Sequence, residues 1–529
     1  MQKVIKSHLT NMQTLKYVLR DEIIFCSGNI KSKINNITSD SRCVSDGSIF
    51  VAVRGENLDG HDYILQAIHA GASCIIGELR FSKLKHIFKK NNFSYIQVKN
   101  SRKTLALLAS KFYNNPSHKM LLIGVTGTSG KTTVTYLLES ILKSAGYCVG
   151  VIGTINTRYK TKVLPAALTT PDPIELQKTM YEMKASGCDA IVMEVSSHAL
   201  KQDRVLGLAF DAMAFTNLSS EHLDYHKNMK DYFQAKAKLF HDGITWAFQA
   251  KKKPIFCINT DDAYGKLLVK HINRQKQKPK RLYIVSNSRK DFRLVTWQEK
   301  ELLLAGIRGK IGVINSEKSR SSLISISSGI IGDFNASNIL MAIAIAKGLG
   351  INKKAIQNGV AGLQSIPGRL EKIPNLHKRL VLVDYAHKPE AMKKVLLLLS
   401  HMKKNGRLIT VFGCGGDRDR KKRPVMGRYA VRFSDYVIVT SDNPRTEDPK
   451  KIINEILKGT KGFHNFRVSM DRKKAIHQAV KMSKPYDIIL IAGKGHEDYQ
   501  ILADKKHQTR KIHFSDKEIV KEVFRRKII

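Results

Sequence analysis

The chain has 529 residues, 42% of them hydrophobic, which is long enough for about three or four domains and too apolar for a disordered protein. Lysine and arginine (90 residues) outnumber aspartate and glutamate (45 residues), so the formal net charge is +45. No paired aromatic residues interleave with the scattered basic clusters, as a nucleic-acid stacking platform would require. We interpret the charge as a lysine-rich solvated surface, and attraction of a polyanionic substrate stays open as an alternative.

The sequence favours a cytoplasmic protein. The first twenty residues hold no uninterrupted apolar segment, and no run of about 18 apolar residues occurs, so neither a secretory signal nor a membrane span is predicted. The seven cysteines lie far apart without a Cys-x-x-Cys motif, which argues against a disulfide framework or a zinc site.

Two turns divide the chain into three predicted parts. In residues 1–115, short apolar runs at 48–53 and 72–77 alternate with helical patterns, which predicts a small α/β unit. The turn Asn115-Pro116-Ser117 ends this part, and Pro367-Gly368 separates a middle part, 116–366, from a last part, 367–529.

The middle part opens on a phosphate-binding loop. An apolar run at 120–125 predicts a strand, Gly124 to Thr133 form a glycine-rich turn, and 134–142 have the pattern of an amphipathic helix. Gly127 and Gly130 let backbone N–H groups converge on phosphate at a helix N-terminus. Lys131 can reach the terminal phosphates, and the Thr132 hydroxyl can ligate Mg²⁺. Val125 stands where a full Walker A motif has its first glycine.

Polar residues follow two further strands of the middle part. The strand at 190–195 ends on Glu194, whose natural partner beside a phosphate loop is Mg²⁺. The strand at 212–216 precedes a segment rich in metal-capable side chains, in a spacing that is not a zinc pattern. One of its imidazoles could join the Mg²⁺ ligands or only fix the loop by hydrogen bonds. These side chains belong to Glu221, His222, Asp224 and His226.

The helical stretch at 229–240 contains three lysines. A buried lysine has its charged form disfavoured, and a neutral amine can react with CO₂ to give a carbamate, an anionic ligand for Mg²⁺. Lys236 lies among small and apolar neighbours, but the residues alone do not choose among Lys230, Lys236 and Lys238. Any one of them could instead snorkel to the surface.

The last part alternates apolar strands with polar or glycine-rich endings, which predicts a doubly wound α/β domain that binds ligands at the carboxyl ends of its strands. The predicted strands are 380–383, 408–412, 436–439 and 487–492, and their endings are 383–387, 411–419, 441–445 and 492–497.

Taken together, these motifs resemble those of the Mur ligases, ATP-dependent amide-bond-forming enzymes of peptidoglycan precursor synthesis. The resemblance extends from Asp40-Ser-Arg42 to Glu497, and Asp442-Asn-Pro-Arg445 resembles the form of the motif that selects diaminopimelate rather than lysine. It implies a three-domain α/β architecture. The expected domains are a UDP-sugar-binding domain at 1–115, a central P-loop ATPase domain at 116–366 and a Rossmann-like amino-acid-binding domain at 367–529.

The resemblance also implies an activity. It is the addition of meso-2,6-diaminopimelate to UDP-N-acetylmuramoyl-L-alanyl-D-glutamate through an acyl-phosphate, with ATP as substrate, Mg²⁺ as cofactor, no nucleic acid and a monomeric enzyme. One alternative is a folylpolyglutamate synthetase, against which the 442–445 motif and the Asp-Ser-Arg segment count. Another is a basic nucleic-acid-binding ATPase, which leaves the last domain unexplained.

Site residues carry over from the resemblance position by position. The implied catalytic residues are Lys131, Glu194, His222 and Lys236, and the implied Mg²⁺ ligands are Thr132, Glu194, His222 and Lys236 as its carbamate. The ATP contacts would be Gly127, Thr128, Ser129, Gly130, Lys131, Thr132, Thr133, Asn335, Asn338 and Arg369.

The resemblance also implies contact residues for the nucleotide-sugar peptide and for diaminopimelate. The nucleotide-sugar contacts would be Ser39, Ser41, Glu56, Asn57, Leu58, Thr169, Thr170, Ser196, Gln202 and Arg204. Of these, residues 56–58 match by position more than by residue type. The diaminopimelate contacts would be Arg418, Asp442, Asn443, Pro444, Arg445, Gly493 and Glu497. Residues 310–328 and the tail after Phe514 carry no assignment.

Overall fold

A computed structural model describes residues 12–28, 34–56, 58–90, 93–286, 294–313, 322–375, 377–504 and 508–525. The chain packs as two compact units. Unit 1 comprises Met1–Gln298, Ile311–Ile324 and Ser337–Gly359, and unit 2 comprises Glu299–Lys310, Ser325–Ala336 and Val360–Ile529. Within the described ranges, no helix is long and apolar enough to cross a membrane.

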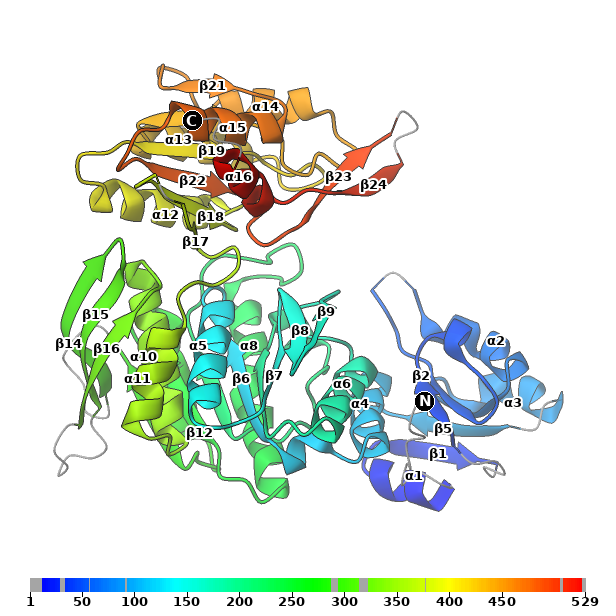
Figure 1. The fold of residues 1–529 in the computed structure, drawn as a ribbon. Coiled ribbons are helices and arrows are strands. Elements are labelled where there is room, and N and C mark those ends of the chain that lie inside the picture. The colour runs from blue at the N-terminus through cyan, green and yellow to red at the C-terminus, as the bar shows by residue number, and fades with distance from the viewer. Residues whose placement is uncertain are drawn as a thin grey trace. The chain divides into compact units, whose positions relative to one another are not determined.

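The N-terminal part of unit 1 is a five-stranded sheet with the order β1-β5-β4-β3-β2 (Figure 1). Only β1 runs antiparallel to its neighbour, and apolar clusters cover both faces of the sheet. The α/β fold expected here is therefore confirmed. The elements are α1 (Met12–Leu19), β1 (Ile23–Ser27), β2 (Asn36–Thr38), β3 (Ser48–Val51), α2 (Ile64–His69), β4 (Ala72–Gly77), α3 (Phe81–Lys90), β5 (Ser94–Val98) and α4 (Ser101–Phe112).

The central part of unit 1 is built on a mostly parallel sheet with the strand order β13-β12-β11-β6-β10-β7-β8-β9. Strand β6 lies in the middle of this order and is buried along nearly all of its length, so the loop that follows it starts from a rigid position. The strands are β6 (Leu121–Thr126), β7 (Val149–Ile152), β8 (Asn156–Tyr159), β9 (Lys162–Pro165), β10 (Ala190–Glu194), β11 (Ala212–Phe215), β12 (Ile255–Asn259) and β13 (Arg281–Val285).

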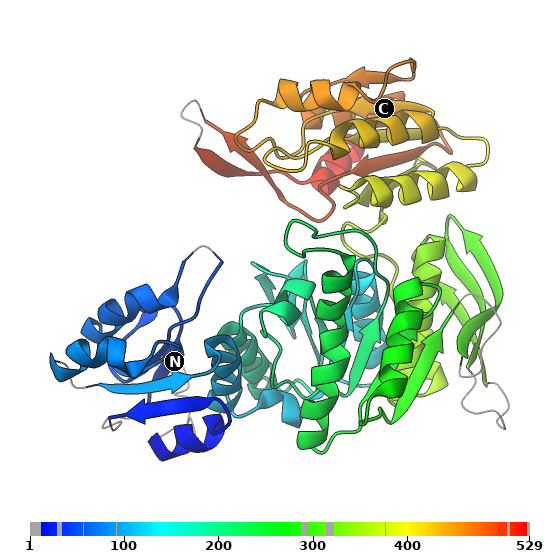
Figure 2. The ribbon, with the colours of Figure 1, turned by 180° about the vertical axis from the view of Figure 1, so that it is seen from behind.

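Helices cover both faces of this sheet, as the two opposite views show (Figures 1 and 2). The β-rich region expected after residue 292 is present in the described residues as three further strands. The helices are α5 (Lys131–Ser144), α6 (Pro173–Ala185), α7 (Ser197–Lys201), α8 (Met229–Gln249), α9 (Ala263–Arg274), α10 (Asp333–Gly348) and α11 (Lys353–Gly362), and the strands are β14 (Leu294–Leu303), β15 (Gly306–Val313) and β16 (Ser322–Ser328).

Unit 2 contains the doubly wound domain that the sequence predicts. Its sheet has the order β17-β18-β22-β19-β20-β21, parallel except for β17, and separate apolar clusters lie on its two faces. The elements are β17 (Glu371–Ile373), β18 (Leu380–Asp384), α12 (Pro389–Met402), β19 (Leu408–Phe412), α13 (Lys422–Phe433), β20 (Tyr436–Val439), α14 (Pro449–Leu457), β21 (Phe466–Val468), α15 (Arg472–Met482), β22 (Ile488–Ala492), β23 (Tyr499–Ala503), β24 (Thr509–His513) and α16 (Asp516–Arg525).

A buried ion pair joins two helices of unit 2 to the carboxyl end of β22. Arg472 on α15 donates two hydrogen bonds of 2.8 Å to the carboxylate of Asp516 on α16, and both side chains are fully buried. The same guanidinium donates to the carbonyl of Ala492 at 3.0 Å. A bidentate ion pair fixes both the direction and the distance between its two side chains. The Arg472 guanidinium is therefore held firmly, and its hydrogen bond to Ala492 fixes the end of β22.

Candidate active site

The phosphate-binding loop leaves the carboxyl end of β6 and turns directly into α5. That helix begins at Lys131, three residues before the expected start at 134, because Gly130 adopts a left-handed conformation (φ 89°) and caps it. A Cβ on Gly127 would lie 1.9 Å from Thr216 Oγ1, so only glycine lets the loop approach the end of β11 this closely. The glycine spacing is therefore required by packing as well as by phosphate access.

Two residues that the sequence analysis left unassigned hold this loop in shape. The carbonyl of Asn217 accepts from Thr128 N at 2.8 Å, and its side-chain oxygen accepts from Ser129 N at 2.9 Å. Thr216 Oγ1 donates to Ser129 O at 2.6 Å. In the sequence, this role was indicated by the position of both residues at the end of the predicted strand that precedes Glu221 and His222.

Two lysines converge on one carbonyl of the loop. Lys131 Nζ and Lys236 Nζ each donate to Gly127 O at 2.9 Å. Lys236 lies on α8, is 1% exposed, and places its amine 4.8 Å from the ring centre of Tyr232. Burial lowers the pKa of Lys236 well below its usual value, and the charge of Lys131 lowers it further. The structure therefore presents Lys236 as an amine whose neutral form is favoured.

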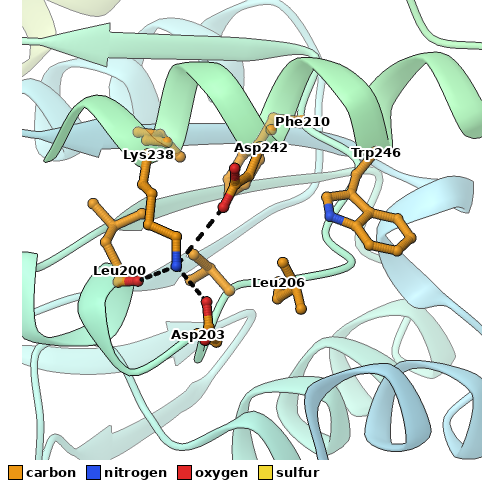
Figure 3. A pocket seen from close by; sticks show the side chains of 10 residues that line it. Leu200, Asp203, Leu206, Phe210, Lys238, Asp242 and Trp246 are labelled. Carbon is orange, nitrogen blue, oxygen red and sulfur yellow. Dashed lines mark hydrogen bonds and ion pairs between the residues drawn. The ribbon is translucent and has the colours of Figure 1, made fainter. Parts of the chain in front are cut away.

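The other two lysines of this helix have different surroundings. Lys230 is exposed. Lys238 lines a pocket in which its Nζ donates to Leu200 O at 3.1 Å and pairs with the carboxylates of Asp203 and Asp242 (Figure 3). Lys238 therefore has ion-pair partners of its own and lacks the apolar burial that surrounds Lys236.

Glu194 ends β10 as a buried carboxylate beside the start of α5. Its Oε1 accepts from Thr132 Oγ1 at 2.9 Å and from Thr154 N at 3.1 Å, and its Oε2 accepts from Thr154 Oγ1 at 2.8 Å. Within the described residues it forms no ion pair, although its side chain is almost fully buried. A buried carboxylate next to a hydroxyl provides the hard oxygen ligands that Mg²⁺ prefers, so the residues present fit this ion.

His222 has a left-handed backbone (φ 56°), and its ring centre lies 4.9 Å from that of His198 and 6.2 Å from that of Tyr232. Burial, and next the charge of Lys131, lower the pKa of its imidazole. His226 instead is buried and contacts Ser197 Oγ at 3.0 Å. The loop-fixing role that the sequence left open for a histidine of this segment therefore suits His226.

Metal-capable side chains do not cluster densely. In the described part of the chain, no group of three or more His, Cys, Asp or Glu residues could hold a metal ion by itself. The expected ligand set draws only Glu194 and His222 from these residue types. The remaining ligands would be the Thr132 hydroxyl and a modified Lys236, so this set stays a prediction.

The predicted peptide-side contacts gather around the end of β10. Thr170 Oγ1 donates to Glu194 O at 2.9 Å and accepts from Ser196 N at 3.0 Å. Arg204 donates to Thr170 O at 2.9 Å and to Gln202 Oε1 at 3.0 Å. Thr169 is the fifth member, with its hydroxyl 3.1 Å from that of Thr154. The structure thus brings all five predicted residues together beside the buried carboxylate.

The predicted nucleotide-sugar contacts of the N-terminal domain follow the parallel strands β2 and β3. Ser39 and Ser41 come directly after β2, and Ser41 Oγ donates to Gln66 Oε1 at 2.9 Å. Glu56 accepts from Gln202 Nε2 at 2.9 Å, while Leu58 is exposed. Asn57 lies outside the described residues.

The three ATP contacts predicted away from the loop divide between the units. Asn338 belongs to unit 1, where its Oδ1 lies 2.4 Å from the place that a Cβ on Gly130 would take. Asn335 and Arg369 belong to unit 2. Asn335 Nδ2 donates to Ile331 O at 2.7 Å, and the Arg369 guanidinium lies 5.2 Å from the ring centre of Tyr385.

In unit 2, the polar strand endings meet at one edge of the parallel sheet, as the sequence predicts. Arg445 has a left-handed backbone (φ 53°), and its Nη1 donates to Gly416 O at 2.7 Å. Asn443 Nδ2 donates to Glu497 Oε2 at 2.9 Å. Gly493 has φ 117°, a conformation that strains any side chain, and a Cβ there would lie 2.5 Å from Asp442 Oδ2. The seven predicted diaminopimelate contacts lie on the loops of this edge, with Pro444 buried and Arg418 exposed.

A buried arginine outside the predicted set braces two of these loops. Arg423 donates to Glu447 at 2.8 Å, to Glu455 at 2.7 Å and to Gly415 O at 3.1 Å. The guanidinium lowers the pKa of Glu447 to about 2. Glu447 in turn accepts from Asp417 N at 2.6 Å, so the glycine-rich loop and the 442–447 segment are held as one body. The sequence did not indicate this role for Arg423, because the residue lies in a run rich in lysine and arginine.

Comparison with known proteins covers all three parts of the chain. The family model of the Mur ligase middle domain matches residues 125–346, that of the Mur ligase glutamate ligase domain matches 368–495, and that of the Mur ligase family catalytic domain matches 33–113. The UDP-N-acetylmuramoyl-L-alanyl-D-glutamate–2,6-diaminopimelate ligase of Geobacter metallireducens is 41% identical over 514 residues, which are 94% of this chain and 95% of that protein.

Two further proteins are similar over nearly their full length. The ligase of the same name from Clostridium tetani is 41% identical over 517 residues, which are 96% of this chain and 99% of that protein. A solved structure of a protein with this name superposes with a TM-score of 0.69 at 29% identity, covering 97% of this chain and 99% of that chain.

Proposed function

Because this chain belongs to the Mur ligase family, we propose that it joins meso-2,6-diaminopimelate to UDP-N-acetylmuramoyl-L-alanyl-D-glutamate, with cleavage of ATP to ADP and phosphate. The observation that carries the choice of amino acid is the assembly of residues 442–445 with Glu497 at the strand ends of unit 2. Relatives named for this reaction match nearly the whole chain, which supports the same reaction here.

The chemistry follows from the poor reactivity of a carboxylate as an acyl donor. ATP phosphorylates the free carboxylate of the nucleotide-sugar peptide, and the amine of diaminopimelate then attacks the acyl-phosphate carbon. The tetrahedral intermediate collapses and releases phosphate. In this scheme Lys131 and the N–H groups of residues 127–133 stabilise charge on the transferred phosphoryl group. Phosphate binding at the start of α5 requires Lys131 to exchange its loop carbonyls for phosphate oxygens.

Mg²⁺ is part of the proposal. When bound, the ion neutralises charge on the phosphates and on the transferred group. Thr132, Glu194, His222 and a carbamylated Lys236 are the residues that would hold it. The support for this set is a buried carboxylate that accepts from the Thr132 hydroxyl and has no cationic partner in the described residues, together with the buried amine of Lys236 at the phosphate-binding loop.

The Lys236 assignment gives a direct prediction. Lys236→Ala is expected to be nearly inactive, because the anionic ligand is lost. Formate or acetate added at millimolar concentration should restore part of the activity by supplying a carboxylate in the vacated space. Steady-state phosphate release with and without the small acid measures both effects.

Lys238→Ala is the matched control on the same helix. Its amine belongs to the pocket with Asp203 and Asp242, so its loss should leave activity within a few-fold of wild type and insensitive to formate. A Lys236→Ala protein with wild-type turnover would show that no carbamate is needed.

The other substrates are assigned by the same proposal. The nucleotide-sugar peptide would contact the residues gathered around the end of β10, together with those after β2 and β3. Diaminopimelate would contact the strand-end loops of unit 2. We also propose that the protein is a cytoplasmic monomer; the support for the compartment is that all seven cysteines are free.

One coupled assay tests the proposed function. The protein is incubated with ATP, Mg²⁺ and UDP-N-acetylmuramoyl-L-alanyl-D-glutamate, and then with either meso-diaminopimelate or lysine. Phosphate release and a product of the mass expected for one added amino acid should occur only with diaminopimelate. ATP cleavage that ignores these substrates but rises with nucleic acid would favour the basic ATPase. Glutamate addition to a folate would favour the folylpolyglutamate synthetase.

A further inference from the structure

Lys494 is a buried lysine in the 492–497 segment to which neither the motif nor the proposed function gives a role. Its side chain is fully buried directly after β22. The ammonium donates to Asn443 Oδ1 at 3.1 Å and lies 3.4 Å from Glu497 Oε2. A buried ammonium is costly unless it is paired and hydrogen-bonded, and both partners of Lys494 are predicted amino-acid contacts.

These contacts determine which way the Asn443 amide points. Its Oδ1 faces two donors, Lys494 Nζ and Ile501 N at 3.0 Å, while its Nδ2 donates to Glu497 at 2.9 Å. Turning the amide over would direct its NH₂ group at both donors and its oxygen at a carboxylate. The network therefore allows one orientation of Asn443, and Lys494 supplies the charged part of the restraint.

Lys494 also distinguishes the two oxygens of Glu497. Oε2 is engaged by Asn443 and Lys494, whereas Oε1 has, among the described residues, only a long 3.4 Å contact with the Tyr385 hydroxyl. The Glu497 side chain keeps 16% exposure while that of Lys494 has none. The carboxylate is thus held from its buried side, and its other oxygen remains free to accept from a ligand.

We propose that Lys494 is a positioning residue for the amino-acid substrate. It acts through Asn443 and Glu497, holding the amide and the carboxylate in the orientations that bind diaminopimelate, without touching the substrate itself. The inference rests on the proposed function, because it assumes that this edge of unit 2 binds the amino acid. A residue that only filled the core would contribute to stability but not selectively to the affinity for one substrate.

The test is steady-state kinetics of Lys494→Met, which has a similar length but no charge and no donor. We expect the KM for diaminopimelate to rise by about 10-fold or more, because a buried charged partner of both contact residues is lost. The KM values for ATP and for the nucleotide-sugar peptide should stay within about 2-fold. Lys494→Gln keeps a donor for Asn443 and should recover part of the loss.

A double-mutant cycle separates positioning from an independent effect. In an Asn443→Ala background, Lys494→Met should raise the KM for diaminopimelate by a smaller factor than in the wild-type background, because one of the two residues through which it acts is missing. If the two substitutions raise the KM for diaminopimelate by factors that simply multiply in the double variant, Lys494 acts independently of Asn443 and the proposal is contradicted. An unchanged KM for diaminopimelate in Lys494→Met, or an equal rise for all three substrates, would also contradict it.

Lys403→Met serves as the matched control in the same unit. Lys403 pairs with Asp435 at 2.6 Å, at the amino ends of β19 and β20, and should leave all three KM values unchanged. Thermal unfolding checks that Lys494→Met is folded. If it is not, the same KM values are measured with Lys494→Gln. An error in the proposed function can be told apart from an error in this inference, because the wild-type protein itself would then not ligate diaminopimelate. An active wild type with unaffected Lys494 variants overturns only this inference.

Discussion

Replacing Lys131 with alanine is expected to lower ligase turnover by about 10³-fold or more while the protein remains folded. The amine lies at the first residue of α5 and donates to the carbonyls of Gly127 and Thr128. In the proposed reaction it compensates the charge that develops on the transferred phosphoryl group. Removing one preorganised hydrogen-bond donor commonly lowers the rate by about 10²–10³-fold. Charged groups that contact the phosphoryl group in the transition state have a larger effect on the rate.

The fold should survive because the hydrogen bonds that shape the loop come from other residues. Thr216 and Asn217 supply them, and Gly130 caps the helix. Phosphate release under saturating substrates measures turnover, and circular dichroism checks the fold. Lys143→Ala, further along α5, removes a lysine paired with Glu139 and should retain wild-type turnover. A folded Lys131→Ala protein with near-normal turnover would end the assignment of the loop to ATP.

Arg445→Ala is expected to abolish the preference for diaminopimelate over lysine. The Arg445 guanidinium donates to Gly416 O and, among the described residues, forms no ion pair. Its planar fork can bond the distal carboxylate of diaminopimelate with two hydrogen bonds. Lysine lacks that carboxylate and would leave the guanidinium desolvated and unpaired, which costs about 2–5 kcal/mol. A site built to bind a missing group can discriminate by about 10⁴-fold.

The measurement is kcat/KM for both amino acids in wild type and variant. Wild type should prefer diaminopimelate by about 10⁴-fold, and Arg445→Ala should lose most of its diaminopimelate activity while its affinity for ATP stays nearly constant. Arg432→Ala, an exposed arginine near the end of α13, should behave as wild type. A wild type that uses lysine equally well, or a variant that keeps the preference, would show that Arg445 only braces its turn.

The sequence by itself determined the architecture and the position of the phosphate loop. Strand and helix periods, glycine at 127 and 130, and the polar ending of each strand are local properties, so the α/β fold and the family could be predicted from them. The start of α5 was the exception. The amphipathic pattern begins at residue 134, whereas capping by the left-handed Gly130 starts the helix at Lys131.

Tertiary structure alone decided which polar residues face one another. Lys230, Lys236 and Lys238 share one helix, and only the packing of α8 buries the amine of Lys236 against Gly127 while it pairs Lys238 with Asp203. The restraint of Asn443 by Lys494 joins residues 51 positions apart. The pKa of a lysine and the orientation of an amide depend on burial and on partners distant in sequence, which no local pattern encodes.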